Sequence, residues 1–235
     1  MSRPDPREAL AGLVAACAEE PDAFEAERRL ARGLRSAREA KAFDLMPDIA
    51  LALADRRMAR FEAALSADRL TVLEEQQELE EDALIEPGLH LLRPPFFVAA
   101  DARRIRLMAM EQSVPVLAVC HEPITRMGLC PVVAIAPGAT IRVKVRPPAD
   151  WTDAESVADW MVEAHGALGD QAVDLIDGEL AATKRLDQLL DRLDAIPEHR
   201  ELHEAVAAIV PEVIREAEEE AASGGRRRRT SRKAS

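Results

Sequence analysis

Hydrophobic positions recur with the period of an α-helix in the first and the last third of the chain. Leu10, Leu13 and Val14, for example, fall on one helical face. The same spacing of leucine, isoleucine and valine returns after the middle of the chain. We therefore predict that residues 6–83 form a series of helices, and that residues 153–222 form a second series.

The middle of the chain changes to the two-residue period of β-strands. Residues 104–107 and 140–146 alternate between basic and apolar side chains, whereas residues 114–120 and 132–136 are apolar at nearly every position. A Pro-Gly pair between the last two segments is typical of a tight turn. These four segments predict a four-stranded antiparallel sheet, either as a meander or as a small barrel.

The predicted fold class is α+β, with one compact body and a tail. About fifty residues of β structure bury too little apolar surface to be stable alone, so we expect helices to pack on the sheet. The predicted divisions are a helical region (1–92), an antiparallel β region (93–148), a second helical region (149–222) and a disordered arginine-rich tail (223–235).

The composition is sufficient for a folded body but says little about chemistry. Hydrophobic residues make up 48% of the 235 positions, whereas aromatic residues make up 3%, which disfavours base-stacking platforms. Three cysteines, no apolar leader and no run of roughly 18 apolar residues predict a cytoplasmic protein without a transmembrane segment. Abundant arginine and alanine without asparagine indicate a bacterial source with a GC-rich genome.

Charge is distributed in blocks along the chain. The net charge is -12, yet residues 96–147 carry 7 Lys/Arg against 3 Asp/Glu, and the last ten residues carry 6 cations and no acid. Residues 1–95 carry 13 Lys/Arg against 20 Asp/Glu, and residues 148–225 carry 5 against 20. Two regions of this acidic protein are therefore expected to attract anions.

The basic C-terminal run is the first candidate site. A disordered arginine run binds polyanions through phosphate contacts and counterion release, so we predict contact with nucleic acid or another polyanion. Two alternatives are open: the run folds back on the acidic body or on a neighbouring subunit, or it only keeps the chain soluble. Its cations are Arg226, Arg227, Arg228, Arg229, Arg232 and Lys233.

The basic face of the predicted sheet is the second candidate site. Five cations of the first and last predicted strands share the outer face if the alternating apolar side chains face the core. Such a face suits phosphate, nucleic acid or an acidic protein segment, whereas acidic helices that cover the sheet would neutralise it. These cations are Arg104, Arg106, Arg142, Lys144 and Arg146.

Cysteine and histidine form two weaker patterns. Cys120-His121 followed by Cys130 offers one adjacent ligand pair, whereas zinc usually takes two closely spaced pairs. A buried cysteine also behaves as a small hydrophobic residue. His199 and His203 are spaced i,i+4, which suits a metal, but two partly exposed helix histidines explain the spacing equally simply. We therefore predict no metal and no cofactor.

No Gly-rich phosphate loop and no G-x-S-x-G motif occurs in the sequence. We therefore predict a non-enzymatic binding or regulatory protein. Its body would bind a protein partner or itself as a homo-oligomer, and its tail would contact a polyanion. One alternative is an enzyme or small-ligand sensor that holds an anionic ligand between sheet and helices through Arg104, Arg106, Arg142 and Arg146. Another is a structural oligomer or cargo-type protein.

Overall fold

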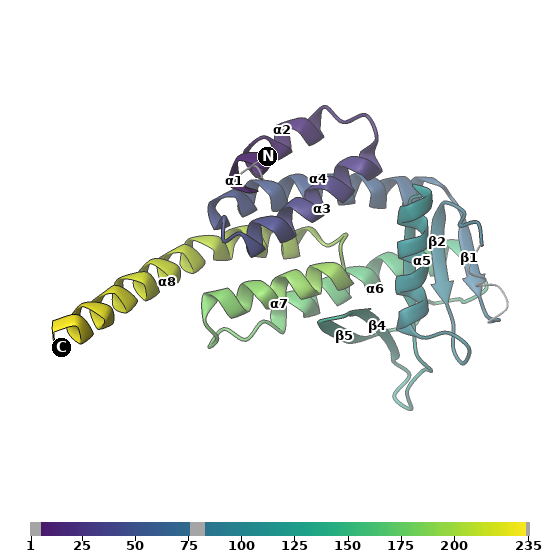
Figure 1. Ribbon diagram of the computed structural model, residues 1–235. Coiled ribbons are helices and arrows are strands. Elements are labelled where there is room, and N and C mark those ends of the chain that lie inside the picture. The colour runs from purple at the N-terminus through teal and green to yellow at the C-terminus, as the bar shows by residue number, and fades with distance from the viewer. Residues whose placement is uncertain (1–5, 76–82, 234–235) are drawn as a thin grey trace.

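The computed structural model describes residues 6–75 and 83–233, with side chains for residues 7–75 and 83–222. Within these residues the chain forms eight α-helices, one short 3-10 helix and five strands (Figure 1). The elements in chain order are α1 (Pro6–Ala11), α2 (Leu13–Ala18), α3 (Ala23–Glu39), η1 (Phe43–Leu45), α4 (Met46–Ser66), β1 (Leu70–Leu73), β2 (Gly88–Leu92), α5 (Ala99–Gln112), β3 (Val116–Cys120), β4 (Cys130–Ala136), β5 (Ala139–Val145), α6 (Ala154–Asp174), α7 (Ala182–Ala195) and α8 (Arg200–Lys233).

Helices α1 to α4 form the N-terminal layer, as the helical period predicts. Asp22 begins α3 because its carboxylate accepts hydrogen bonds from the backbone amides of Phe24 and Glu25, at 2.9 and 3.1 Å. Helices α3 and α4 then pack against each other through the apolar side chains of their facing sides. This layer ends at Ser66, earlier than the sequence predicts.

A three-stranded parallel sheet in the order β1-β2-β3 follows this layer. Both β1 and β2 lie in the region 1–92 that the sequence predicts to be helical, so that prediction is wrong for these residues. Neighbouring parallel strands require a crossover, which α5 provides between β2 and β3. Gly88 begins β2 with a φ of +125°, and a Cβ there would lie 2.5 Å from the carbonyl oxygen of Arg69.

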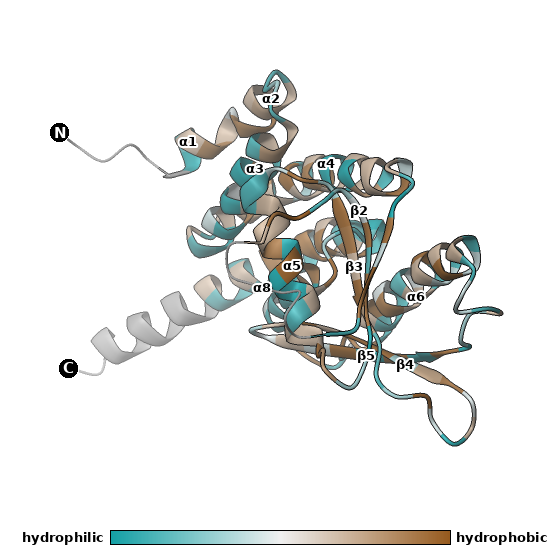
Figure 2. Cartoon of the chain, turned by 90° about the vertical axis from the view of Figure 1, so that its right-hand side faces the viewer, coloured by the Kyte–Doolittle hydropathy of each residue, from teal (hydrophilic) through white to brown (hydrophobic). Residues whose placement is uncertain are grey.

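Both faces of the parallel sheet are covered, which explains why its strands are apolar at nearly every position. Leu92 and Val116 pack in a cluster with α5, whereas Leu91 and Leu117 face the larger core that includes α4. Figure 2 shows how hydrophobic β2 and β3 are along their length. A strand covered on both faces is thus found within 114–120, as β3, but it lies at the edge of a parallel sheet whose central strand is β2.

Residues 104–107 belong to helix α5, so the predicted four-stranded antiparallel sheet is wrong. Four alternating residues are too few to distinguish a strand from a helix. The longer pattern is helical, because the buried positions of α5 are Ala102, Ile105 and Ala109. Ser113 ends this helix in the left-handed conformation, with a φ of 57°.

The predicted hairpin is confirmed, but as a sheet of two strands. β4 and β5 pair antiparallel in a register that places Ala136 opposite Ala139 across the turn. One isolated antiparallel bridge, between His121 and Val132, connects this hairpin to the end of β3. The fold is therefore α+β with a three-stranded parallel sheet and a two-stranded antiparallel sheet.

Helices α6, α7 and α8 form the C-terminal part and pack on the hairpin and on α4 (Figure 1). Asp153 begins α6 by accepting a hydrogen bond from the backbone amide of Ser156 at 3.1 Å. Helix α8 extends to Lys233 and so includes most of the segment 223–235 that the sequence predicts to be a disordered tail. No helix in residues 6–75 and 83–233 is long and apolar enough to cross a membrane.

Both tryptophans of the chain meet at the contact between β5 and α6. The rings of Trp151 and Trp160 lie 5.2 Å apart, and His121 stacks on Trp151 at 5.0 Å. The guanidinium of Arg93 lies over the Trp151 ring, 5.2 Å from its centre. The indole nitrogen of Trp160 donates a hydrogen bond to the carbonyl oxygen of Arg146 at 2.8 Å, which fixes α6 to the end of the hairpin.

Candidate functional site

The predicted basic sheet face is not assembled in the structure. Arg104 and Arg106 lie on α5, whereas Arg142 and Lys144 lie on β5 and Arg146 follows that strand. Because the first two belong to a helix, the five cations do not share one face of a sheet. On the hairpin alone, Arg142 and Lys144 do share an exposed face. That this smaller face binds an anion stays a prediction.

The side chains of the C-terminal cations lie outside the described residues. These cations are Arg226, Arg227, Arg228, Arg229, Arg232 and Lys233, and their backbone continues α8 as a helix. The structure thus draws as helix a segment that the sequence predicts to be disordered. The predicted contact of its cations with nucleic acid or another polyanion stays a prediction.

Cys120 and Cys130 are both buried, and neither is poised as a nucleophile. Burial raises the pKa of the Cys120 thiol to about 12 and that of the Cys130 thiol to about 11. Both thiols are therefore protonated at neutral pH, and a protonated thiol is a poor nucleophile and a poor metal ligand. The neighbouring His121 is buried against the two tryptophans.

The two histidines spaced i,i+4 are buried, contrary to the prediction that they are partly exposed. His199 is 8% exposed and precedes α8, whereas His203 is 1% exposed and lies within it. The Nδ1 atom of His203 lies 2.9 Å from the carbonyl oxygen of Ala50, and its Nε2 atom lies 3.0 Å from that of Pro197. This ring therefore connects α4 to the start of α8.

Seven arginines surround a cleft of about 390 Å³, which we call the arginine cleft. It lies between α3, α4, α5 and the loop that joins α7 to α8. Each helix contributes arginines three or four positions apart, so the arginines of one helix lie on one face. The seven are Arg28, Arg32 and Arg35 of α3, Arg57 and Arg60 of α4, and Arg103 and Arg106 of α5.

A buried carboxylate holds the two α4 arginines at the inner end of the cleft. Glu27 accepts hydrogen bonds from Nε of Arg57 at 3.2 Å and from Nε and Nη2 of Arg60 at 2.8 and 3.2 Å. Arg60 also lies 2.8 Å from Glu198. Burial opposes the charge on Glu198, but Arg60 and Arg106 outweigh it and lower the Glu198 pKa to about 2. These side chains therefore form a buried network of charges.

Arg106 is fixed by the end of helix α7. Its Nη1 and Nη2 atoms donate hydrogen bonds to the carbonyl oxygens of Ala195 and Asp194, at 2.6 and 2.7 Å. The last carbonyls of a helix have no partner within the helix and carry partial negative charge, which a guanidinium compensates. Burial nevertheless lowers the pKa of Arg106 to about 10. Arg106 is thus oriented by backbone and not by a carboxylate.

Two buried guanidinium nitrogens lack a hydrogen-bond partner. They are Nη1 of Arg57, a residue that is 7% exposed, and Nε of Arg103. Arg103 has no ion pair with any carboxylate in the described part of the chain, and its nearby charge is the like charge of Arg106. A buried charged donor without an acceptor is energetically unfavourable. Both atoms belong to side chains that line the cleft.

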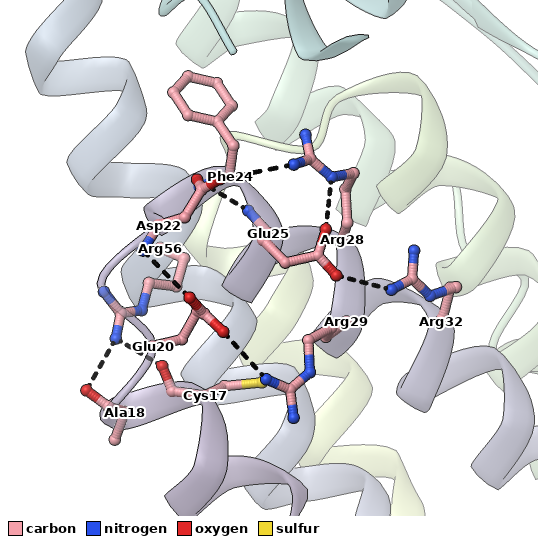
Figure 3. Close-up of polar contacts among 10 residues, drawn as sticks. All are labelled: Cys17, Ala18, Glu20, Asp22, Phe24, Glu25, Arg28, Arg29, Arg32 and Arg56. Carbon is pink, nitrogen blue, oxygen red and sulfur yellow. Dashed lines mark hydrogen bonds and ion pairs between the residues drawn. The ribbon is translucent and has the colours of Figure 1, made fainter.

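The mouth of the cleft is formed by the arginines of α3. Figure 3 shows Glu25 between two of them, with its carboxylate 3.0 Å from Nε of Arg28 and 3.1 Å from Nη2 of Arg32. Arg35, one turn further along, lies 3.9 Å from Asp194. These ion pairs are more exposed than the inner ones, so water screens them more strongly.

Cationic charge exceeds anionic charge around the cleft. Within the described residues, five carboxylates form ion pairs with five of the seven arginines, and Arg103 and Arg106 form none, so two positive charges remain in excess. This excess is notable in a chain whose net charge is -12. The five carboxylates are those of Asp22, Glu25, Glu27, Asp194 and Glu198.

Of the seven cleft arginines, only Arg106 is among the five cations predicted for the basic sheet face. The signal in the sequence is the helical spacing of arginines at 28, 32 and 35 and at 57 and 60. That spacing shows that each set lies on one face. It does not show that faces of three separate helices meet.

We compared the chain with protein-family models, with curated proteins and with solved structures. No protein-family model, no curated protein and no solved structure matches the chain.

Proposed function

We propose that this protein binds a small, phosphate-bearing ligand in the arginine cleft and acts as a ligand-binding or regulatory protein. The observation that carries the proposal is the buried Nη1 atom of Arg57, which has no partner in a cleft with excess positive charge. A ligand that brings anionic oxygens into the cleft supplies the missing acceptors and compensates the excess charge.

The chemistry of guanidinium groups supports a phosphate and supports binding over proton transfer. A guanidinium presents parallel N–H donors that match two oxygens of a phosphate group. It also keeps its proton near neutral pH, so it holds an anion but does not serve as a general acid or base. Arg57 and Arg103 line the cleft from different helices, which allows one phosphate group to accept hydrogen bonds from both.

This proposal is related to the small-ligand alternative drawn from the sequence, but it uses different residues. Of the arginines named there, Arg106 lines the arginine cleft, whereas Arg104, Arg142 and Arg146 do not. The cleft also lies among helices and not against the hairpin. A regulatory protein that binds a protein partner remains compatible with such a ligand.

The test is isothermal titration calorimetry of the full chain with inorganic pyrophosphate. We expect binding to the unmodified protein and weaker binding by about tenfold or more for Arg103→Gln, because a charged hydrogen bond is worth about 1.5–3 kcal/mol. Arg103 pairs with no carboxylate in the described residues, so the substitution should not lower the free energy of unfolding. If Arg103 served only stability, Arg103→Gln would lower the free energy of unfolding and leave pyrophosphate affinity unchanged.

The matched control is Arg142→Gln on the exposed face of the hairpin. This variant removes the same charge from the chain and should leave pyrophosphate affinity unchanged within about twofold. Equal weakening by both variants would mean that only net charge matters and would overturn the proposal. So would the absence of pyrophosphate binding to the unmodified protein.

A further inference from the structure

One face of the β4–β5 hairpin lines a groove of about 740 Å³, which we call the hairpin groove. Two rows of side chains cover this face, one on each strand, and the register places the members of the two rows opposite each other. Alternate residues of a strand point to the same side, so each row is continuous along its strand. The row on β4 is apolar, with Pro131, Val133 and Ile135, whereas the row on β5 is polar, with Thr140, Arg142 and Lys144.

The rest of the groove lining is mostly apolar as well. It comes from residues 94–100, which lead into α5, and from the loop between β3 and β4. Val98 in the first of these segments is 60% exposed. A neighbouring hollow shares three prolines with the groove and includes Phe96 and Ile124, which are 56% and 47% exposed. An exposed apolar surface of this extent is typical of a site that binds another protein.

The charge of the groove favours an acidic partner. Arg142 lies 2.6 Å from Glu122, the one carboxylate among the described lining residues. Lys144 is exposed and forms no ion pair in residues 7–75 and 83–222, so one cation of the groove has no counter-ion there. The phosphates of a nucleic acid would contact the two cations but leave the apolar row exposed to water. A peptide that carries both acidic and apolar side chains uses both rows.

We infer that the hairpin groove binds an extended segment of a partner protein in which acidic residues alternate with apolar ones. In an extended segment successive side chains point to opposite sides. A segment that lies between the two rows therefore directs its apolar side chains to the β4 row and its acidic side chains to Arg142 and Lys144. Alternate residues are about 6–7 Å apart in the segment and in the strand, so the spacings match. The groove and the arginine cleft share no lining residue.

Fluorescence anisotropy of labelled heptapeptides with the full chain tests the inference. In the first peptide valine alternates with glutamate, in the second the same residues stand in two blocks, and in the third valine alternates with lysine. We expect the first peptide to bind roughly fivefold more tightly than the second, because only the first matches both rows along its length. The third should not bind, because its charge is reversed.

Two variants locate the bound peptide on the groove. Lys144→Gln should weaken binding of the alternating acidic peptide about two- to fivefold, whereas Lys184→Gln, at an exposed position of α7, should leave it unchanged.

Val98→Ser should weaken binding about three- to tenfold by removing an apolar contact. Serine is a favourable residue at this position, which precedes the first turn of α5, so the substitution should not lower the free energy of unfolding. The matched control is Leu175→Ser, at an exposed position that follows α6.

Three outcomes would overturn the inference. The first is that no peptide binds, or that the acidic peptides bind equally well to Lys144→Gln, Val98→Ser and the unmodified chain. The second is that a single-stranded oligonucleotide binds through Lys144 while the peptides do not. The third is a dimer in light scattering that Val98→Ser dissociates, since a second copy would then occupy the groove. Because no phosphate ligand takes part in these measurements, their failure leaves the proposed phosphate site standing.

Discussion

The arginine cleft and the β4–β5 hairpin contain the same kind of ion pair in different surroundings. In the cleft, Arg60 bonds to Glu27 at 2.8 Å, with both side chains 5% exposed. On the hairpin, Arg142 lies 2.6 Å from Glu122, with side chains 56% and 40% exposed. Water screens the second pair but not the first. The difference teaches that the number of ion pairs says little about stability or function until burial is known.

The largest expected effect is that of removing the buried carboxylate. Glu27→Gln leaves Arg57 and Arg60 without their shared counter-ion inside the protein, so the free energy of unfolding should fall by about 3–5 kcal/mol. Urea denaturation followed by circular dichroism measures this loss. Pyrophosphate should recover part of it, since the substitution makes the cleft more positive.

The hairpin provides the control for this prediction. Glu122→Gln removes the partner of Arg142 and should lower the free energy of unfolding by less than about 1 kcal/mol, because the pair is exposed. Similar losses in the two variants would show that burial does not distinguish the two regions, and the comparison would fail.

A smaller effect is expected from acid, which should lower the free energy of unfolding through a buried histidine. His165 is 8% exposed, and burial lowers its pKa from 6.5 to about 4. As the pH falls below 6.5, the unfolded chain takes up a proton at this residue, whereas the folded protein does so only near pH 4. The free energy of unfolding should therefore decrease on acidification through this window, by about 3 kcal/mol for His165.

Denaturation curves between neutral pH and about pH 4 measure this slope. His165→Gln should make the slope shallower, since one proton uptake is removed. Glu198 acts in the same direction at lower pH: its pKa of about 2 in the folded protein means that its stabilisation is lost as the pH falls below 4.5. An unchanged slope in His165→Gln would contradict the buried, neutral state of this histidine.

The smallest expected effect on the cleft is that of removing the basic C-terminal run. A chain that ends at Ala222 should bind pyrophosphate as the full chain does. If the tail contacts polyanions, the full chain binds duplex DNA with a log-log salt slope no steeper than about -5, and the shortened chain loses this binding. Loss of pyrophosphate binding on shortening would place the anion site in the tail and not in the cleft.

Local sequence patterns predicted the hairpin but not the parallel sheet, because the strands of the parallel sheet are shorter. Residues 132–136 and 140–146 alternate or stay apolar over five to seven positions with a turn between them, so the hairpin follows from neighbours in sequence. β1 has four residues and β2 has five, and both strands pair with partners far along the chain. Such short apolar runs are equally compatible with helices.

The sequence did not predict the arginine cleft, and the reason is different. The partners of the buried network, Glu27, Arg60 and Glu198, come from α3, α4 and the loop before α8. Their proximity depends on how the helices pack, which no periodicity in the sequence encodes. Charge counting along the chain placed excess cations at residues 96–147, yet five of the seven cleft arginines lie in the acidic block 1–95.

The clustering of both tryptophans has a spectroscopic consequence. The chain has two tryptophans and no tyrosine, and Trp151 and Trp160 touch each other beside His121. Intrinsic fluorescence therefore originates from one place, the contact between the hairpin and α6. Far-ultraviolet dichroism instead averages over all the helices. Coincident melting curves from the two signals would show that this corner and the helical layers unfold as one cooperative unit.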